Sequence, residues 1–103
     1  MKTALVTLSA EGAEILRKLA AAMDDADVYV HNQVPGKHSA ERFESIVALT
    51  ENIFEHHQAL IYAAPCGVVV RAIAPLIKSK LTDPAVVVID AGARFSISLL
   101  AGH

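Results

Sequence analysis

The sequence predicts an α/β fold: a three-layer, open and mostly parallel sheet of the Rossmann or flavodoxin-like kind, with strand order 2-1-3-4-5 and a C-terminal β-hairpin. Short apolar runs rich in Val, Ile and Ala alternate with segments whose apolar residues recur at helical spacing. That alternation is typical of parallel strands joined by right-handed helical crossovers. The last two runs are separated by only a few residues that include glycine, which predicts that the fifth strand pairs antiparallel with the fourth.

The N-terminal third of the chain predicts a strand, a helix and a second strand. Residues 3–8 (TALVTL) form a nearly continuous apolar run, typical of a strand buried on both faces. We expect Ser9 to cap the following helix, with Glu11 in its first turn. Apolar residues then recur along one helical face, at Ile15, Leu16, Leu19 and Met23. Residues 27–30 (DVYV) are the second expected strand.

The middle third predicts a loop, a second helix and a third strand. Residues 31–39 contain Asn, Pro and Gly without apolar periodicity, which indicates a connecting loop. We expect Ser39 to cap an amphipathic helix of about three to four turns. The apolar face of that helix would carry Phe43, Ile46, Val47, Ile53 and Phe54. Residues 58–64 (QALIYAA) then form the third strand.

The last third begins with a strand-to-helix turn at residues 65–67 and ends in the hairpin. Residues 67–77 are apolar almost all round, so we expect a helix covered by protein rather than by solvent. Pro75 would kink this helix or restart it as a second short helix that ends near Lys80. The two hairpin strands are residues 85–90 (AVVVID) and 95–100 (FSISLL).

Composition limits the classes of partner. At 103 residues, with 53% hydrophobic and 19% charged residues, the chain has the length and apolar content of a single α/β domain over residues 1–103. A net charge of -2 provides no basic field for nucleic acid. The longest uncharged apolar runs fall short of the roughly 20 residues that span a bilayer, and the N-terminus lacks a signal-peptide pattern. The lone Cys66 cannot form an intramolecular disulfide, and together these features favour a cytosolic protein.

Ligands of open α/β sheets bind beyond the carboxyl ends of the parallel strands. This rule selects the segments that follow the first four expected strands, namely residues 9–12, His31 with Asn32, residues 65–67, and Asp90. The turn at residues 65–67 places backbone N–H groups of a helix N-terminus at this edge. Gly67 and Arg71, one turn further on, would together hold an anion such as a carboxylate. The alternative is that Arg71 pairs with Asp90 or Asp83, or caps carbonyl groups at strand ends, and only neutralises a local charge.

Cysteine and histidine suggest two other kinds of site. Cys66 at a helix N-terminus is a candidate nucleophile. No base is paired with it in the sequence, however, and packing of a small side chain is the alternative that we favour. Five histidines are present, but none has the spacing of a metal site, so we expect no metal held by the protein.

Two segments in the C-terminal part of the chain resemble a known family. The runs GVVVRAIAPLIKSKLTDPAVVVID (residues 67–90) and GARFSISLLAGH (residues 92–103) look like the N-terminal region of the CbiG family, the cobalt-precorrin-5A hydrolases of cobalamin biosynthesis. The resemblance runs from about Ala64 to His103. It implies a cytosolic enzyme of the anaerobic vitamin B12 route, with this chain as the N-terminal part of a longer protein.

The resemblance also implies a reaction. Members of the family hydrolyse the δ-lactone of cobalt-precorrin-5A and release a two-carbon unit as acetaldehyde, which gives cobalt-precorrin-5B. The cobalt is carried by the tetrapyrrole substrate, so no separate cofactor is implied. The alternative is a noncatalytic module that binds a tetrapyrrole or a carboxylate and presents the substrate to a partner.

The polar positions that match the family supply the expected site residues. Asp90 and His103 are the candidate catalytic residues, either one serving as general base for the water that attacks the lactone carbonyl. Substrate binding is expected from Gly67, Arg71, Lys80, Asp83, Ser98 and Gly102. In this interpretation Arg71 binds an acetate or propionate group of the substrate. The hairpin edge at residues 95–100 would be the seam of a homodimer or the surface for a C-terminal CbiG domain.

Overall fold

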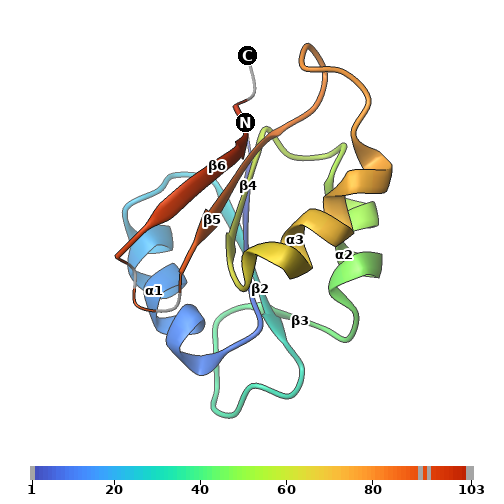
Figure 1. Cartoon of the computed structure of the whole chain (residues 1–103). Coiled ribbons are helices and arrows are strands. Elements are labelled where there is room, and N and C mark those ends of the chain that lie inside the picture. The colour runs from blue at the N-terminus through green and yellow to red at the C-terminus, as the bar shows by residue number, and fades with distance from the viewer. Residues whose placement is uncertain (1, 91, 93, 102–103) are drawn as a thin grey trace.

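The computed structural model describes residues 2–90, 92 and 94–101, and its centre is a six-stranded sheet with the order β3-β2-β1-β4-β5-β6 (Figure 1). The strands are β1 (Thr3–Thr7), β2 (Ala26–His31), β3 (Glu41–Phe43), β4 (Ala59–Ala63), β5 (Ala85–Ile89) and β6 (Ser96–Leu100). The helices are α1 (Ala10–Ala21), α2 (Ile46–Ile53) and α3 (Cys66–Ile73), and a short 3₁₀ helix, η1 (Ala74–Leu76), follows α3. This arrangement confirms the predicted α/β class.

The strands follow the predicted topology. β1 to β5 run parallel to one another, and β6 pairs antiparallel with β5. The five predicted strands correspond to β1, β2, β4, β5 and β6, so the order 2-1-3-4-5 and the C-terminal hairpin are confirmed. β1 lies in the interior of the sheet, where Leu5 is opposite Val28 of β2 and Ile61 of β4. β3 was not predicted, and it adds a sixth strand at the edge of the sheet beside β2.

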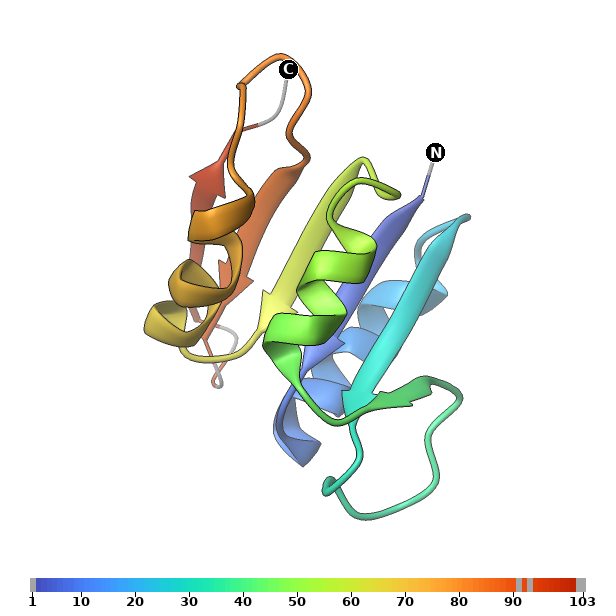
Figure 2. The same cartoon turned by 90° about the vertical axis from the view of Figure 1, so that its right-hand side faces the viewer.

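Helices cover both faces of the sheet, as predicted. Figure 2 shows α2 and α3 in front of the sheet and α1 behind it. The larger core lies under α2 and α3, where Val69 belongs to the same buried cluster as Leu60 and Val86. The smaller core lies under α1, where Leu16 packs with Leu5. The central strands are apolar on both faces because each of them contributes to both cores.

One polar pair lies inside the larger core. The Tyr62 hydroxyl of β4 and the Thr50 hydroxyl of α2 are 2.7 Å apart, and both side chains are fully buried. The pair satisfies two polar groups that would each cost about 1–3 kcal/mol to bury alone. Burial raises the pKa of Tyr62 to about 12, so the phenol stays neutral and ties α2 to the sheet.

Two hydroxyl side chains hold the turn from β1 into α1. Ser9 caps α1 as predicted, because its side chain accepts a hydrogen bond from the Gly12 N–H at 2.9 Å. Thr7 is fully buried, and its hydroxyl donates to the Ala63 carbonyl of β4 at 2.9 Å. A Cβ added at Gly12 would collide with the Thr7 hydroxyl and would lie 3.1 Å from the Ala63 Cβ. Glycine at this position therefore lets α1 start directly against the sheet.

The second helix starts later than the sequence predicts. Ser45 rather than Ser39 caps α2, since the Ser45 side chain accepts a hydrogen bond from the Ala48 N–H at 3.2 Å. The residues before it form β3, from which Phe43 is buried in the larger core. Phe43 has the sequence spacing of an apolar helical face with Ile46 and Val47. In the structure it lies on β3 instead, and the pairing of β3 with β2 places it at the core. The predicted helix of three to four turns is therefore a strand followed by a helix of about two turns.

The loop between β2 and β3 is organised by one arginine. The guanidinium of Arg42 donates hydrogen bonds of 2.7–2.8 Å to the carbonyl groups of His31, Val34 and Gly36. Gly36 has a φ of 96°, a backbone conformation that favours glycine. The loop thus has fixed partners for its carbonyl groups although it contains no regular secondary structure.

α3 is amphipathic, which differs from the predicted helix covered on all sides. Its buried residues are Val69, Ala72 and Ile73. Val70 and Arg71 are exposed to solvent, so the apolar residues of this run do not all mark buried positions. Pro75 restarts the helix only as η1, and the predicted second helix ending near Lys80 is wrong.

A matched pair of glycine substitutions tests the close approach of α1. Gly12→Ala is expected to lower the free energy of unfolding by about 1–3 kcal/mol, because the new Cβ forces Thr7 or the first turn of α1 to move. Gly67→Ala is the control: a Cβ there meets no heavy atom within 4 Å, so alanine should be neutral or stabilise by up to ~1 kcal/mol. Urea denaturation measures both variants. Equal unfolding free energies for the two would contradict the close contact.

Candidate functional site

A pocket of 330 Å³ opens at the carboxyl edge of the sheet, between the ends of β1, β4 and β5 and the β5–β6 hairpin. Its wall is mostly apolar and includes Leu8, Pro65, Val88, Phe95 and Ile97. Ser9, Cys66 and Asp90 also line it, so three of the four segments that the strand-end rule selects meet at this pocket. The fourth, at His31, lines a separate hollow between β1 and β2.

Asp90 follows β5 at the rim of the pocket. Its Oδ1 accepts hydrogen bonds from the backbone N–H groups of Phe95 at 2.9 Å and Arg94 at 2.8 Å, which closes the hairpin turn. These bonds, that of Phe95 first, lower the pKa of Asp90, so the side chain is a carboxylate at neutral pH. A carboxylate with a lowered pKa is a weak base. Asp90 is therefore better suited to orient a water molecule or a ligand donor than to accept a proton from it.

The N-terminus of α3 forms another part of the rim. Pro65 is the N-cap residue and provides no side-chain hydrogen bond, so the first N–H groups of α3 receive no side-chain cap. Open space lies outside Gly67, where a Cβ would meet no heavy atom within 4 Å. The positive end of the helix dipole thus faces an accessible region beside the apolar wall, which is an arrangement that favours an anionic group.

Arg71 pairs with neither Asp83 nor Asp90. It is exposed on α3 and forms no hydrogen bond or ion pair with any residue that the structure describes. Asp90 closes the hairpin, and the buried Asp83 accepts hydrogen bonds from the backbone N–H groups of Lys78 and Ser79. The arginine stands in the α3 run because it faces solvent, one turn beyond the open helix N-terminus.

Two other expected binding residues lie at the opposite edge of the sheet. Lys80 and Asp83 precede β5, whereas Asp90 follows it. The five residues of β5 separate the two groups by roughly 17 Å along the strand. The structure therefore brings Gly67 and Asp90 to one edge and leaves Lys80 and Asp83 at the other.

The remaining expected residues are on or after β6. Ser98 is opposite Val87, and this pair lies on the face of the sheet that α1 covers, away from the pocket residues Val88 and Ile97. A role of Ser98 in substrate binding stays a prediction. Gly102 and His103 lie outside the described residues.

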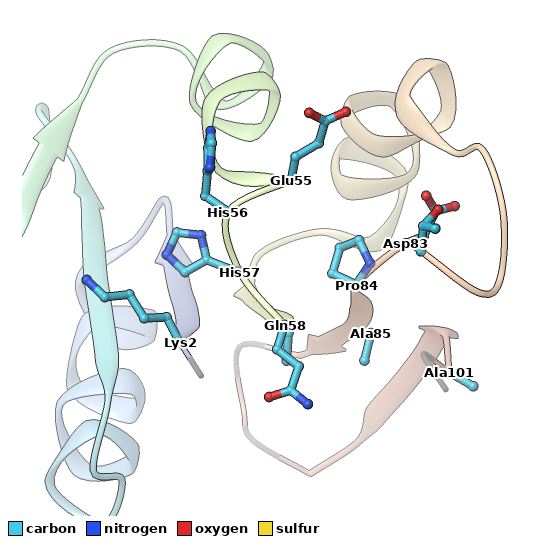
Figure 3. A pocket seen from close by; sticks show the side chains of 11 residues that line it. Lys2, Glu55, His56, His57, Gln58, Asp83, Pro84, Ala85 and Ala101 are labelled. Carbon is cyan, nitrogen blue, oxygen red and sulfur yellow. The ribbon is translucent and has the colours of Figure 1, made fainter.

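A larger cavity of 590 Å³ lies at the amino edge, and Figure 3 shows the side chains around it. Lys2, His57 and Glu55 of this cavity already have charged partners, and Asp83 accepts backbone hydrogen bonds. His57 is 2.9 Å from the Asp27 carboxylate, Lys2 is 3.6 Å from the same oxygen, and Glu55 is 2.9 Å from the Lys78 ammonium. The hydrogen bond with His57 lowers the pKa of Asp27. Because these groups neutralise one another, the smaller pocket at the carboxyl edge is the better candidate for a ligand site.

Other candidate chemistry has a structural explanation. His31 is held by the Glu44 carbonyl at 2.9 Å and by the Gln33 N–H at 3.2 Å, so both of its ring nitrogens are engaged. Cys66 is half-buried and packs against the larger core. Among the described residues, no group of three or more His, Cys, Asp or Glu side chains is arranged to hold a metal ion. None of the described helices has the length and apolar character needed to cross a bilayer.

Comparison with known proteins identifies relatives. The family described as Cobalamin synthesis G N-terminal matches residues 48–103. The cobalt-precorrin-5A hydrolase of Priestia megaterium is 38% identical over 105 residues, which cover 97% of this chain and 28% of that protein. The cobalt-precorrin-5A hydrolase of Salmonella typhimurium is 50% identical over 50 residues, 48% of this chain and 14% of that protein. The chain thus spans less than a third of the length of these relatives.

A solved structure has a similar fold. The crystal structure of a cobalamin biosynthesis protein G homologue from Sulfolobus solfataricus matches with a TM-score of 0.71 over 99% of this chain and 30% of that chain. The sequences are 23% identical, so this likeness concerns the fold. The segment that matches the family includes β4, α3, β5 and Asp90, which form most of the pocket wall.

The pH dependence of stability tests the role of Asp90 in the hairpin. The folded state lowers its pKa below the ordinary 3.8, so its contribution to stability is complete above about pH 5 and is lost as pH falls through the folded pKa. Asp90→Asn keeps an oxygen acceptor but does not titrate. Urea unfolding of both proteins between about pH 2 and 6 should show the wild-type advantage shrinking on acidification. Parallel pH curves would exclude a lowered pKa.

Proposed function

Since this chain belongs to the Cobalamin synthesis G N-terminal family, we propose that it is the substrate-binding N-terminal part of a cobalt-precorrin-5A hydrolase. The family and the two hydrolase relatives support a role in cobalamin biosynthesis. The proposed reaction opens the δ-lactone of cobalt-precorrin-5A with water and releases acetaldehyde, which gives cobalt-precorrin-5B. Cobalt enters as part of the substrate, and the proposal needs no cofactor held by the protein.

The pocket at the carboxyl edge is the observation that carries this proposal. A tetrapyrrole intermediate has a flat, partly apolar ring and several carboxylates at its rim. The pocket offers an apolar wall at Leu8, Val88 and Ile97 beside a helix N-terminus without a side-chain cap. Apolar contact would hold the ring, and the positive end of α3 would face a peripheral carboxylate.

We assign the binding roles by position. The backbone N–H of Gly67 and the guanidinium of Arg71 would contact the same carboxylate, since both belong to the first two turns of α3. Lys80 and Asp83 lie at the amino edge, and Ser98 lies on the α1 face of β6. These three residues would therefore contact the substrate only if it also binds to a surface outside the pocket. Gly102 is proposed as a substrate-binding residue because it matches the family motif.

The catalytic roles are assigned to Asp90 and His103. Asp90 is ionised and has one carboxylate oxygen fixed by the hairpin backbone, so it would orient the attacking water. His103 would accept the proton from that water. An imidazole ordinarily has a pKa near 6.5, so it is a stronger base than an aspartate whose pKa is lowered. Attack of water on the lactone carbonyl would break the acyl C–O bond of the ring and leave a carboxylate on the substrate and a hydroxyl group on the two-carbon unit. Loss of the hydroxyl proton and cleavage of the C–C bond to the macrocycle would then release that unit as acetaldehyde, and the macrocycle would keep the electron pair of that bond and take up a proton.

A noncatalytic tetrapyrrole-binding module is the second candidate function. Cys66 and Asp90 are the only ionisable side chains that line the described part of the pocket, and the carboxylate of Asp90 also closes the hairpin. A wall of this kind can bind without catalysing hydrolysis. In that case the chain would present the substrate to a partner that supplies the catalytic groups.

The decisive experiment incubates the 103-residue chain with cobalt-precorrin-5A. Acetaldehyde is measured by a coupled alcohol dehydrogenase assay, and the visible spectrum of the tetrapyrrole is recorded in the same cuvette. Acetaldehyde above the no-protein control places catalysis within this chain. A spectral shift without acetaldehyde supports the binding module, and the absence of both signals would exclude a tetrapyrrole site in the isolated chain.

The anion-binding role of Arg71 has its own test. Arg71→Ala is expected to weaken tetrapyrrole binding about tenfold or more, because a hydrogen bond between charged groups contributes about 1.5–3 kcal/mol. Arg17→Ala is the matched control: Arg17 is also an exposed helical arginine, and it pairs with Glu14 on α1, away from the pocket. Fluorescence-quenching titration measures both dissociation constants. Equal affinities of the two variants would show that Arg71 is only a solvent-exposed residue and does not contact the tetrapyrrole.

A further inference from the structure

The described residues leave β5 and β6 without a covering helix on one of the two faces of the sheet. On one face, α2 and α3 pack over the sheet from β3 to β5. On the other face, α1 packs against β1, β2 and β4, and Figure 2 shows it behind β1 and β2. None of the described helices lies over β5 and β6 on that side.

The sequence of β5 requires burial on both faces. Val86 and Val88 point toward α3 and are buried, whereas Val87 and Ile89 alternate with them, point toward the α1 side and remain partly exposed. An uninterrupted apolar strand is typical of a parallel sheet with a layer on each face. A strand with one solvated face would carry polar residues at the positions of Val87 and Ile89. The pattern of β5 therefore corresponds to a covered strand, and the described residues cover only one side of it.

The uncovered region is a groove of the right dimensions for a helix. A cavity of 570 Å³ runs between α1 and the hairpin, with Ile15 and Leu19 on the α1 side, Ile89 at its floor, and Phe95 and Ser96 on the hairpin side. Packed helices lie about 8–10 Å apart, which is two strand spacings of about 4.8 Å. α1 packs around β1, and β5 is two strands beyond β1 in the sheet. A second helix beside α1 would therefore lie over β5.

We propose that an amphipathic helix from the portion of the hydrolase polypeptide that the relatives possess beyond this matched part packs in the groove between α1 and the β5–β6 hairpin. The match covers 28% of the Priestia megaterium relative, so more than two thirds of that protein lies elsewhere and can supply such a helix. A second copy of this chain fits less well. The buried apolar residues of each described helix face its own sheet, and the exposed Val47 of α2 and Val70 of α3 are single residues. The outer side of α1 is polar at Glu11, Glu14, Arg17 and Lys18.

The proposal rests on the proposed function in so far as the chain is part of a hydrolase polypeptide. The groove lies on the face of the sheet opposite α3 and shares only Phe95 with the pocket at the carboxyl edge, so its occupancy can be measured separately from the reaction. Its occupant would contact Ile15, Leu19, Val87 and Ile89 with apolar side chains. The small Ser96 would allow a close approach of the helix along the hairpin. The charged residues at the rim are Glu14, Lys18 and Arg94, and Glu14 is already paired with Arg17. The remaining positive charges favour acidic residues on the solvent-facing flanks of the helix.

Thiol labelling tests the proposal with a matched pair of cysteines. In a Cys66→Ala background, Ser96→Cys places a thiol in the groove, and Asn52→Cys places one on the exposed side of α2. In the isolated chain both thiols should react with a maleimide at similar rates. The chain is then joined in frame to the remaining part of the Priestia megaterium relative. There we expect Ser96→Cys to react at least tenfold more slowly, while Asn52→Cys keeps its rate.

Two results would overturn the proposal. Unchanged reactivity of Ser96→Cys in the folded fusion would show that the groove stays open. Protection of Ser96→Cys in the isolated chain that increases with protein concentration would show that a second copy occupies it. If the fusion does not fold, cysteines at the positions of the full-length relative that align with Ser96 and Asn52 decide between the same outcomes.

Discussion

The hydrogen bond from the Thr7 hydroxyl to the Ala63 carbonyl joins the ends of β1 and β4, and the carboxyl edge of the molecule depends on it. Thr7 is completely buried at the point where α1 starts, and the absence of a side chain at Gly12 allows this approach. With the two strand ends fixed, the turns at Ser9 and Pro65 border the same pocket. A looser junction would separate these turns, and the apolar wall between them would be lost.

The two edges of the sheet differ in their electrostatics, although each contains acidic and basic groups. At the amino edge, His57, Lys2 and Asp27 form one compact group, and Lys78 pairs with Glu55. At the carboxyl edge, the helix N-terminus of α3 has no side-chain cap. Paired charges attract further ligands weakly, whereas an uncapped helix end retains its capacity to bind an anion. This contrast distinguishes the two cavities better than their volumes do.

The sheet was predictable because its strands are short apolar runs between clear turn residues, and the parallel order follows from the crossovers. β3 was not predictable, since Phe43 satisfies helical spacing as well as strand burial, and only its pairing with β2 decides between them. The strand-end rule brought Ser9, Cys66 and Asp90 correctly to one pocket. Family motifs did not carry this spatial information: Asp83 and Asp90 belong to one motif, but β5 holds them at opposite edges.

The interior position of β1 has a consequence for how the chain acquires its structure. β1 is synthesised before the other strands of this sheet, yet it pairs with β2 on one side and with β4 on the other. Residues 59–63 must therefore emerge from the ribosome before the second edge of β1 finds its partner. Until then, β1 and β2 present an apolar edge with unsatisfied backbone groups, which is a site for misassociation. Cotranslational assembly of this sheet is thus limited by the arrival of β4, and shorter nascent chains leave one edge of β1 unpaired.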